Sequence, residues 1–230
     1  RMVMQSIYLY DEVKIAKKKE PGITLTTNLK FLPTGDGNIA YKAAQLLMDE
    51  FDLKEGVQIT LNKHIPVAAG LAGGSSNAAA VLFGMNRLFG LRLTQQDRGV
   101  KLGADVPYCI MRGTVLAEGI GEELSVLPAM PKCTVLIAKP PISVSTKMVY
   151  EALDSKEIVE HPDIDGILEG LRKGDLHKVA DSMGNVLEDV TIPMHPVIAD
   201  IKQVMQDCGA IGAMMSGSGP TVFGLFENRA

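Results

Sequence analysis

The chain has 230 residues, of which 46% are hydrophobic and 22% are charged, and its formal net charge is −4. This composition is typical of a globular protein of one or two domains, and the negative balance argues against a nucleic-acid partner. The apolar runs are too short to span a bilayer, so we expect no membrane segment. The cysteines Cys109, Cys133 and Cys208 are isolated and odd in number. They argue against a disulfide framework or a zinc site and favour a reducing cytoplasm.

In the first half of the chain, alternating and β-branched segments predict strands, and apolar stripes predict helices. The turn signal Glu20-Pro21-Gly22 indicates that the second and third strands form a hairpin. Asn38 is placed to cap the first helix, and Gly90 to end the second. The strands are predicted at residues 2–7, 13–16, 23–26, 57–61 and 113–117. The helices are predicted at residues 38–51, 76–89 and 93–101.

The second half begins after a proline-bounded segment at residues 128–131, where we place a boundary between domains 1–129 and 130–230. Strands and helices mix in both halves without a regular βαβ rhythm, so the predicted fold class is α+β. The later strands are predicted at residues 134–138, 213–216 and 221–226, the last two joined by a glycine turn. The later helices are predicted at residues 146–153, 164–173 and 196–208.

A glycine-rich segment runs directly into the second predicted helix. Glycine lets the backbone approach a ligand closely, and the free N–H groups of a helix N-terminus attract anions. The segment therefore predicts a phosphate cradle, in which one of its two serines caps the helix and the other faces the ligand. It consists of Pro66, Val67, Ala68, Ala69, Gly70, Leu71, Ala72, Gly73, Gly74, Ser75 and Ser76.

Two better-known phosphate loops do not fit this segment. No Gly-Lys-Ser/Thr closes it as in a Walker loop, and the glycine spacing differs from the Rossmann fingerprint. A tight strand-to-helix connection, in which the glycines only permit close packing, is the alternative. Other positions have ordinary interpretations as well: Asp105 as a turn or capping residue, Asn38 as a cap, Met4 as a core residue and 216–219 as a hairpin turn.

The pattern Pro-x-x-Ala-Gly-Leu-x-Gly-Gly-Ser-Ser-Asn-Ala-Ala, which begins at Pro66, resembles the phosphate-binding motif of the GHMP kinases. The resemblance extends over essentially the whole chain. It implies a two-domain α+β fold, with an N-terminal domain like ribosomal protein S5 and a ferredoxin-like C-terminal domain. The other segments that carry it are residues 2–11, 102–108, 113–121, 143–146 and 215–223.

The resemblance implies a kinase that moves the γ-phosphoryl group of ATP, with Mg²⁺, to the 2-hydroxyl of a cytidine-diphosphate-linked polyol in isoprenoid precursor synthesis. Asp105 is implied as the catalytic base and Asn38 as a neighbour of the adenine. We expect Ser75 or Ser76 to be a magnesium ligand, with Ser75 the first choice. We expect a monomer or weak homodimer with no nucleic-acid or membrane partner. The implied substrate-binding residues are Met4, Asp105, Thr146, Gly217 and Ser218.

Two alternatives to this function stay open. One is another GHMP kinase, acting on mevalonate, phosphomevalonate or homoserine, and the other is a non-catalytic nucleotide- or RNA-binding module. The resemblance also implies an opening Ala-Lys-Ile-Asn strand and a Gly-Tyr-His segment, neither of which occurs in these 230 residues. We therefore expect the printed sequence to enter partway through a longer chain, with its first strand missing.

Overall fold

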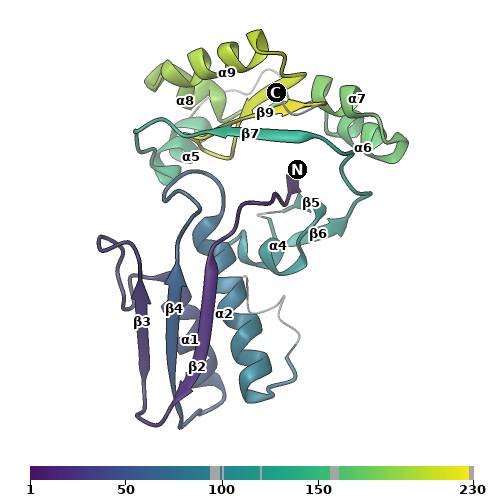
Figure 1. The fold of residues 1–230 in the computed structure, drawn as a ribbon. Coiled ribbons are helices and arrows are strands. Elements are labelled where there is room, and N and C mark those ends of the chain that lie inside the picture. The colour runs from purple at the N-terminus through teal and green to yellow at the C-terminus, as the bar shows by residue number, and fades with distance from the viewer. Residues whose placement is uncertain (94–98, 100, 120, 156–160, 228–230) are drawn as a thin grey trace.

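The computed structural model describes the chain except for residues 94–98, 100, 120, 156–160 and 228–230, and its described part is a mixed α+β fold (Figure 1). Its strands form three sheets of three strands each. The α+β prediction is confirmed. In the part described, no helix is long and apolar enough to cross a membrane. Most of the helix predicted at 93–101, residues 94–98 and 100, lies outside the described residues.

The first sheet corrects the predicted hairpin. β2 (Glu12–Lys18) and β3 (Ile23–Thr27) both exist, but β4 (Gly56–Asn62) lies between them, antiparallel to β2 and parallel to β3. The turn at 20–22 wraps around the start of β4, where the Val57 amide donates to the Gly22 carbonyl. A Cβ on Gly56 would collide with the Glu20 carbonyl oxygen, so only glycine lets β4 enter this turn.

Two helices cover one face of this sheet and form the main core (Figure 1). α1 (Ile39–Glu50) and α2 (Gly73–Phe89) pack closely because α1 buries the small residues Ala40, Ala43 and Ala44. Asn38 caps α1 and Gly90 ends α2 in a left-handed conformation, as predicted. α2 begins at Gly73, three residues earlier than predicted, which changes the position of its serines.

A second sheet lies beside α4 (Val106–Met111), a short helix that was not predicted. It has the order β1-β5-β6, and both pairings are antiparallel. Residues 128–131, where a domain boundary is predicted, connect this sheet to the next. Its strands are β1 (Met2–Gln5), β5 (Thr114–Glu118) and β6 (Glu123–Val126).

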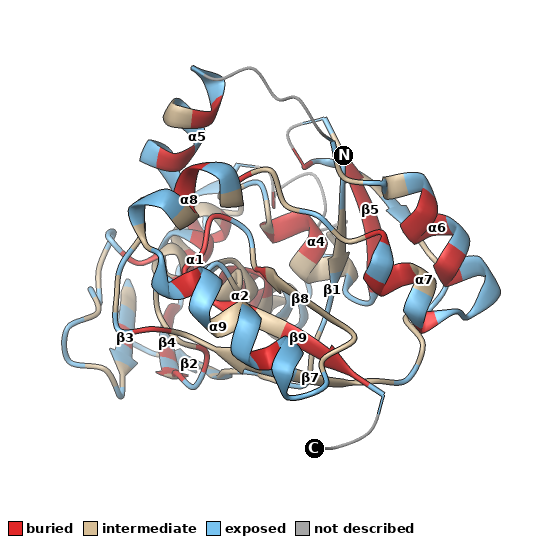
Figure 2. Cartoon of the chain, turned by 90° about the horizontal axis from the view of Figure 1, so that it is seen from above, coloured by how far each residue is buried: buried red, intermediate tan, exposed pale blue. Residues whose placement is uncertain are grey.

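The third sheet carries the second half of the chain and has the order β7-β9-β8, with antiparallel pairs. β8 and β9 form the predicted hairpin around the glycine turn. The helices around this sheet bury one side and expose the other (Figure 2), and α6 also contacts β1. The strands are β7 (Thr134–Ala138), β8 (Gly212–Met215) and β9 (Val222–Phe226). The helices are α5 (Thr146–Asp154), α6 (Ile164–Lys173), α7 (Leu176–Asp181), α8 (Glu188–Met194) and α9 (Val197–Asp207). Of these, α7 and α8 were not predicted.

Two neighbouring residues of α2 test the face that this helix buries. Leu82 is 2% exposed in the main core, whereas Phe83 is 55% exposed. We expect Leu82→Ala to lower the free energy of unfolding by about 2–5 kcal/mol, because it leaves a cavity. The matched variant Phe83→Ala should change it by only about 0.5 kcal/mol. Urea denaturation measures both, and equal losses would contradict this orientation of α2.

Candidate active site

The segment between β4 and α2 has an unusual backbone. Ala68, Gly70 and Ala72 have positive φ angles of 50°, 69° and 49°, whereas the residues between them do not. Alternating left-handed residues are typical of loops whose successive N–H groups face one side and bind an anion. An alanine in this left-handed conformation is strained, so Ala68 and Ala72 store free energy in the loop. Such strain is typical of functional loops.

The start of α2 corrects the predicted role of the two serines. Ala72 occupies the N-cap position and makes no side-chain capping bond, and Ser75 and Ser76 lie within the first turn. The Ser76 hydroxyl donates to the Gly73 carbonyl oxygen over 2.9 Å. Neither serine caps the helix, because the helix begins before them. The first N–H groups of α2 therefore lack a side-chain cap and can meet a ligand.

A loop from the second half of the chain lies directly on this cradle. The Ser216 hydroxyl donates to the Gly70 carbonyl oxygen over 2.7 Å. A Cβ on Gly70 would collide with the Ser216 carbonyl oxygen and would lie 3.1 Å from that of Gly219. Gly70 therefore combines two requirements, a left-handed backbone and close contact with the 216–219 loop.

The 216–219 loop also reaches the start of α5. The hydroxyls of Ser218 and Thr146 are 2.8 Å apart, and Ser218 is buried. Asn185 supports the loop from below by donating to the carbonyl oxygens of Met215 and Gly217. The structure thus brings together three of the predicted substrate-binding residues, Thr146, Gly217 and Ser218. Their contact with a substrate stays a prediction.

Asp105 immediately precedes α4 but makes no side-chain capping bond, so the capping interpretation receives no support. Burial raises the pKa of its carboxyl group above the ordinary value. The Ile39 side chain packs against both the cradle and the aspartate segment. It lies 3.4 Å from a Cβ placed on Gly74, in the cradle, and 3.7 Å from a Cβ placed on Gly103, two residues before Asp105. Asp105 therefore stands in a partly desolvated position close to the first turn of α2.

Two groups interact electrostatically with Asp105. Burial and then the charge of Asp105 raise the pKa of the Tyr150 phenol, on α5. The same two causes raise the pKa of the Cys109 thiol to about 12, so the thiol stays protonated at neutral pH. Tyr150 is 45% exposed although it is a large aromatic residue. Tyr150 was not predicted as a site residue, because one tyrosine on an amphipathic helix carries no distinctive sequence signal.

Asn38 and Met4, the other residues predicted to bind ligands, make no side-chain hydrogen bond to the cradle, the 216–219 loop or Asp105 in the described part of the chain. Asn38 uses both ends of its side chain within the protein: it accepts from the Ala40 amide and donates to the Pro33 carbonyl, each over 2.9 Å. Its role as a cap is confirmed, and its proximity to adenine stays a prediction. Met4 lies on β1 opposite Val115, and its contact with a substrate stays a prediction too.

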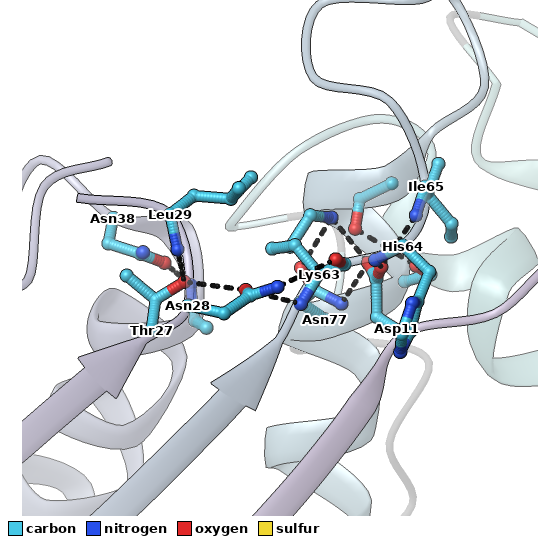
Figure 3. A network of polar contacts seen from close by, with 12 residues as sticks. Asp11, Thr27, Asn28, Leu29, Asn38, Lys63, His64, Ile65 and Asn77 are labelled. Carbon is cyan, nitrogen blue, oxygen red and sulfur yellow. Dashed lines mark hydrogen bonds and ion pairs between the residues drawn. The ribbon is translucent and has the colours of Figure 1, made fainter. Parts of the chain in front are cut away.

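A buried polar network lies beneath the cradle (Figure 3). Asp11, Lys63 and Asn77 contact one another and carry side chains from three different segments. None of the three was singled out from the sequence for a role. Asn77 belongs to the glycine-rich motif and Lys63 stands three residues before it, but only the fold brings Asp11 to them.

Two family models match this chain. They describe the N-terminal domain of GHMP kinases, over residues 38–113, and the C-terminal domain of GHMP kinases, over residues 167–230. The chain is also 57% identical over 232 residues to 4-diphosphocytidyl-2-C-methyl-D-erythritol kinase of Lachnospira eligens, a match that covers 100% of this chain and 81% of that protein. A protein of the same name from Lachnoclostridium phytofermentans is 55% identical, with 100% and 80% covered.

Solved structures agree with these matches. A crystal structure of 4-(cytidine 5'-diphospho)-2C-methyl-D-erythritol kinase has a TM-score of 0.79 and 32% identity, and covers 94% of this chain and 76% of its own. The homoserine kinase of Cytophaga hutchinsonii has a TM-score of 0.80 at 23% identity, covering 95% and 77%, which shows a shared fold.

Both domain models and the full-length relatives therefore define one class of protein, and the chain belongs to the GHMP kinase family of small-molecule kinases. Within this family, the relatives that match its whole length at 55–57% identity are 4-diphosphocytidyl-2-C-methyl-D-erythritol kinases. The family resemblance drawn from the glycine-rich motif is confirmed.

Gly70 and Gly90 provide a matched test of the contact between the cradle and the 216–219 loop. Both have a left-handed backbone, so alanine at either position should cost about 1–2 kcal/mol of stability. Only at Gly70 does the new Cβ meet other atoms, since nothing lies within 4 Å of one on Gly90. We expect Gly70→Ala to lower kcat/KM for ATP at least about tenfold, because misplaced binding groups are costly. Gly90→Ala should keep wild-type kinetics, and equal kinetic losses would contradict this view of the contact.

Proposed function

We propose that this kinase phosphorylates the 2-hydroxyl of 4-diphosphocytidyl-2-C-methyl-D-erythritol with ATP, a step of the non-mevalonate route to isoprenoid precursors. The carrying observation is the 57% identity over the whole chain to a kinase named for this substrate. The left-handed residues of the loop within 66–76 and the partly buried carboxylate of Asp105 near it support the proposal. The free state of Cys109, Cys133 and Cys208 supports a cytoplasmic site of action.

The cradle is proposed to hold the triphosphate of ATP. Its N–H groups and the positive end of the α2 dipole neutralise phosphate charge and act most strongly where charge develops in the transition state. Residues 66–76 are the proposed phosphate-binding residues, and Asn38 at the start of α1 lies on the proposed adenine side.

The residues present also fit a magnesium ion that is held mainly by phosphates. No group of three or more His, Cys, Asp or Glu side chains that could hold a metal is found in the described part of the chain. Mg²⁺ bound with a nucleotide commonly needs only one or two protein ligands. The Ser76 hydroxyl is engaged with Gly73, whereas Ser75 makes no hydrogen bond through its side chain to any described residue. Ser75 is therefore the proposed ligand, and a bound ion would supply charge neutralisation there.

Asp105 is the proposed general base. As the substrate hydroxyl attacks the γ-phosphorus, its proton passes to the Asp105 carboxylate, the new P–O bond forms and ADP leaves. Partial burial suits this role, because it strengthens the affinity of the carboxylate for a proton.

The substrate is proposed to lie between Asp105 and the α5 side of the second half. The exposed ring of Tyr150 offers a flat surface on which a cytosine ring can stack. The Thr146 and Ser218 hydroxyls are held together nearby and can contact polar parts of the substrate. Gly217 and Met4 complete the proposed substrate side.

Asp105→Asn tests the proposed base. We expect kcat to fall at least about tenfold while the KM for ATP changes little, because the amide cannot accept the proton. Only the ionised form of Asp105 is a base, and burial raises its pKa above the ordinary carboxyl value of about 3.9. In the wild type, kcat/KM should therefore fall on the acid side at a pH above that value. Asp49→Asn, on the exposed end of α1, is the control. Wild-type turnover by Asp105→Asn would contradict the assignment.

A panel of acceptors tests the proposed substrate. With ATP and Mg²⁺, we expect phosphorylation of 4-diphosphocytidyl-2-C-methyl-D-erythritol, detected by phosphorus NMR of the product, and far less of mevalonate, phosphomevalonate or homoserine. Contacts to the cytidine diphosphate belong to this acceptor alone, and uncompensated polar groups strongly disfavour the others. Preference for another acceptor would replace the proposed substrate. ATP binding without transfer to any acceptor would indicate a non-catalytic module.

A further inference from the structure

One carboxylate holds both ends of the anion-binding loop. The Asp11 side chain is 1% exposed and follows the connection from β1 to β2. Its Oδ1 accepts hydrogen bonds from the backbone amides of His64 and Ile65, over 2.7 and 2.8 Å. Its Oδ2 accepts a hydrogen bond from the side-chain amide of Asn77 over 2.8 Å. The first contacts fix the chain just before the loop at 66–72, and the last fixes α2 just after it.

Lys63 completes this arrangement from beneath α2. Its ammonium group pairs with Asp11 and donates to the Asn77 side-chain oxygen over 3.0 Å. It lies 3.2 Å from a Cβ placed on Gly73, the first residue of α2. The Lys63 side chain is only 4% exposed, and reciprocal backbone bonds with the Asn28 side chain, of 2.8 and 3.0 Å, hold its main chain. Figure 3 shows these side chains converging.

The Asp11 carboxylate is well suited to be a permanent acceptor. Burial alone would raise its pKa, but the hydrogen bonds from Lys63, Ile65, His64 and Asn77 together lower it below the ordinary value. The group is therefore ionised at neutral pH and accepts from all its neighbours at once. A buried ion pair is weak evidence for stability, since well-packed apolar residues often stabilise a protein as much. A network of this kind at a loop that needs one conformation indicates a role in specifying that conformation.

The loop between the anchored ends is strained. Left-handed conformations at Ala68 and Ala72 cost of order 1–3 kcal/mol each, and such conformations persist only where the surroundings fix them. With its ends free, the loop could relax out of these left-handed conformations.

We propose that Asp11, Lys63 and Asn77 are positioning residues that hold the 66–72 loop in its anion-binding conformation and thereby set the affinity for ATP. The proposal rests on the ATP-binding role given above to that loop. The three residues act through the backbone of the loop and α2, because their side chains are buried and contact one another and the chain at both ends of the loop.

The test separates this role from simple structural support. Asp11→Asn or Lys63→Met alone leaves a buried charge without its partner and should destabilise the fold. The double variant Asp11→Asn/Lys63→Met removes both charges, so its thermal unfolding should recover toward the wild type. We expect its Kd and KM for ATP to remain at least about tenfold raised, with kcat at saturating ATP within about threefold of the wild type. Asn77→Ala, which keeps the ion pair, should raise the same two constants.

An exposed ion pair gives the control. Glu169→Gln/Lys173→Met removes two charges that pair over 2.6 Å on the outer face of α6, and both stability and ATP binding should be unchanged. Wild-type ATP affinity in the folded Asp11→Asn/Lys63→Met variant would overturn the proposal. ATP binding is measured by calorimetry without an acceptor, so it does not depend on the proposed reaction. A wild type that binds ATP but phosphorylates no acceptor would refute the proposed reaction. The same titrations would still decide whether the three residues position the loop.

Discussion

The open N-terminus of α2 imposes the constraint on which the site depends. Anion binding needs N–H groups that no side chain caps and a loop that points them to one centre, and both features cost free energy in the empty protein. The surrounding structure offsets this cost at three places. β4 fixes where the loop leaves the sheet, the Asp11 carboxylate ties that point to α2, and the 216–219 loop covers Gly70 from the other side. The conformation of a few residues therefore rests on segments from the whole chain.

The same constraint explains the arrangement of the two halves. The first half supplies the loop and Asp105, and the second supplies the 216–219 loop, Thr146 and Tyr150. The Ser216–Gly70 contact joins the halves at the cradle, and the ion pair between Arg1 and Asp165 joins them at a second place. A substrate between them would meet groups from both, which suits a reaction in which a nucleotide and a second molecule must be aligned.

Local patterns predicted most elements correctly. Most strands, both long helices of the first half, the Asn38 cap and the Gly90 stop follow from periodicity and from residues with strong local preferences. The short helices α4, α7 and α8 did not emerge, because one or two turns give no clear period. The hairpin at 20–22 was wrong for a different reason: a turn signal shows that the chain reverses, but not whether a later strand enters between the two arms.

The sequence by itself determined the family and the class of chemistry, and it predicted the loop proposed to hold the phosphates. Glycines next to a helix start restrict the backbone locally, and that restriction can be read without the fold. Only the tertiary structure decided where α2 begins, and so that Ser75 and Ser76 do not cap it. It also showed that Asp11, Lys63 and Asn77 form one buried group and that Tyr150 interacts with Asp105. These relations join residues up to 66 positions apart, as Asp11 and Asn77 are. Long-range contacts depend on how sheets and helices pack, which local preferences do not specify.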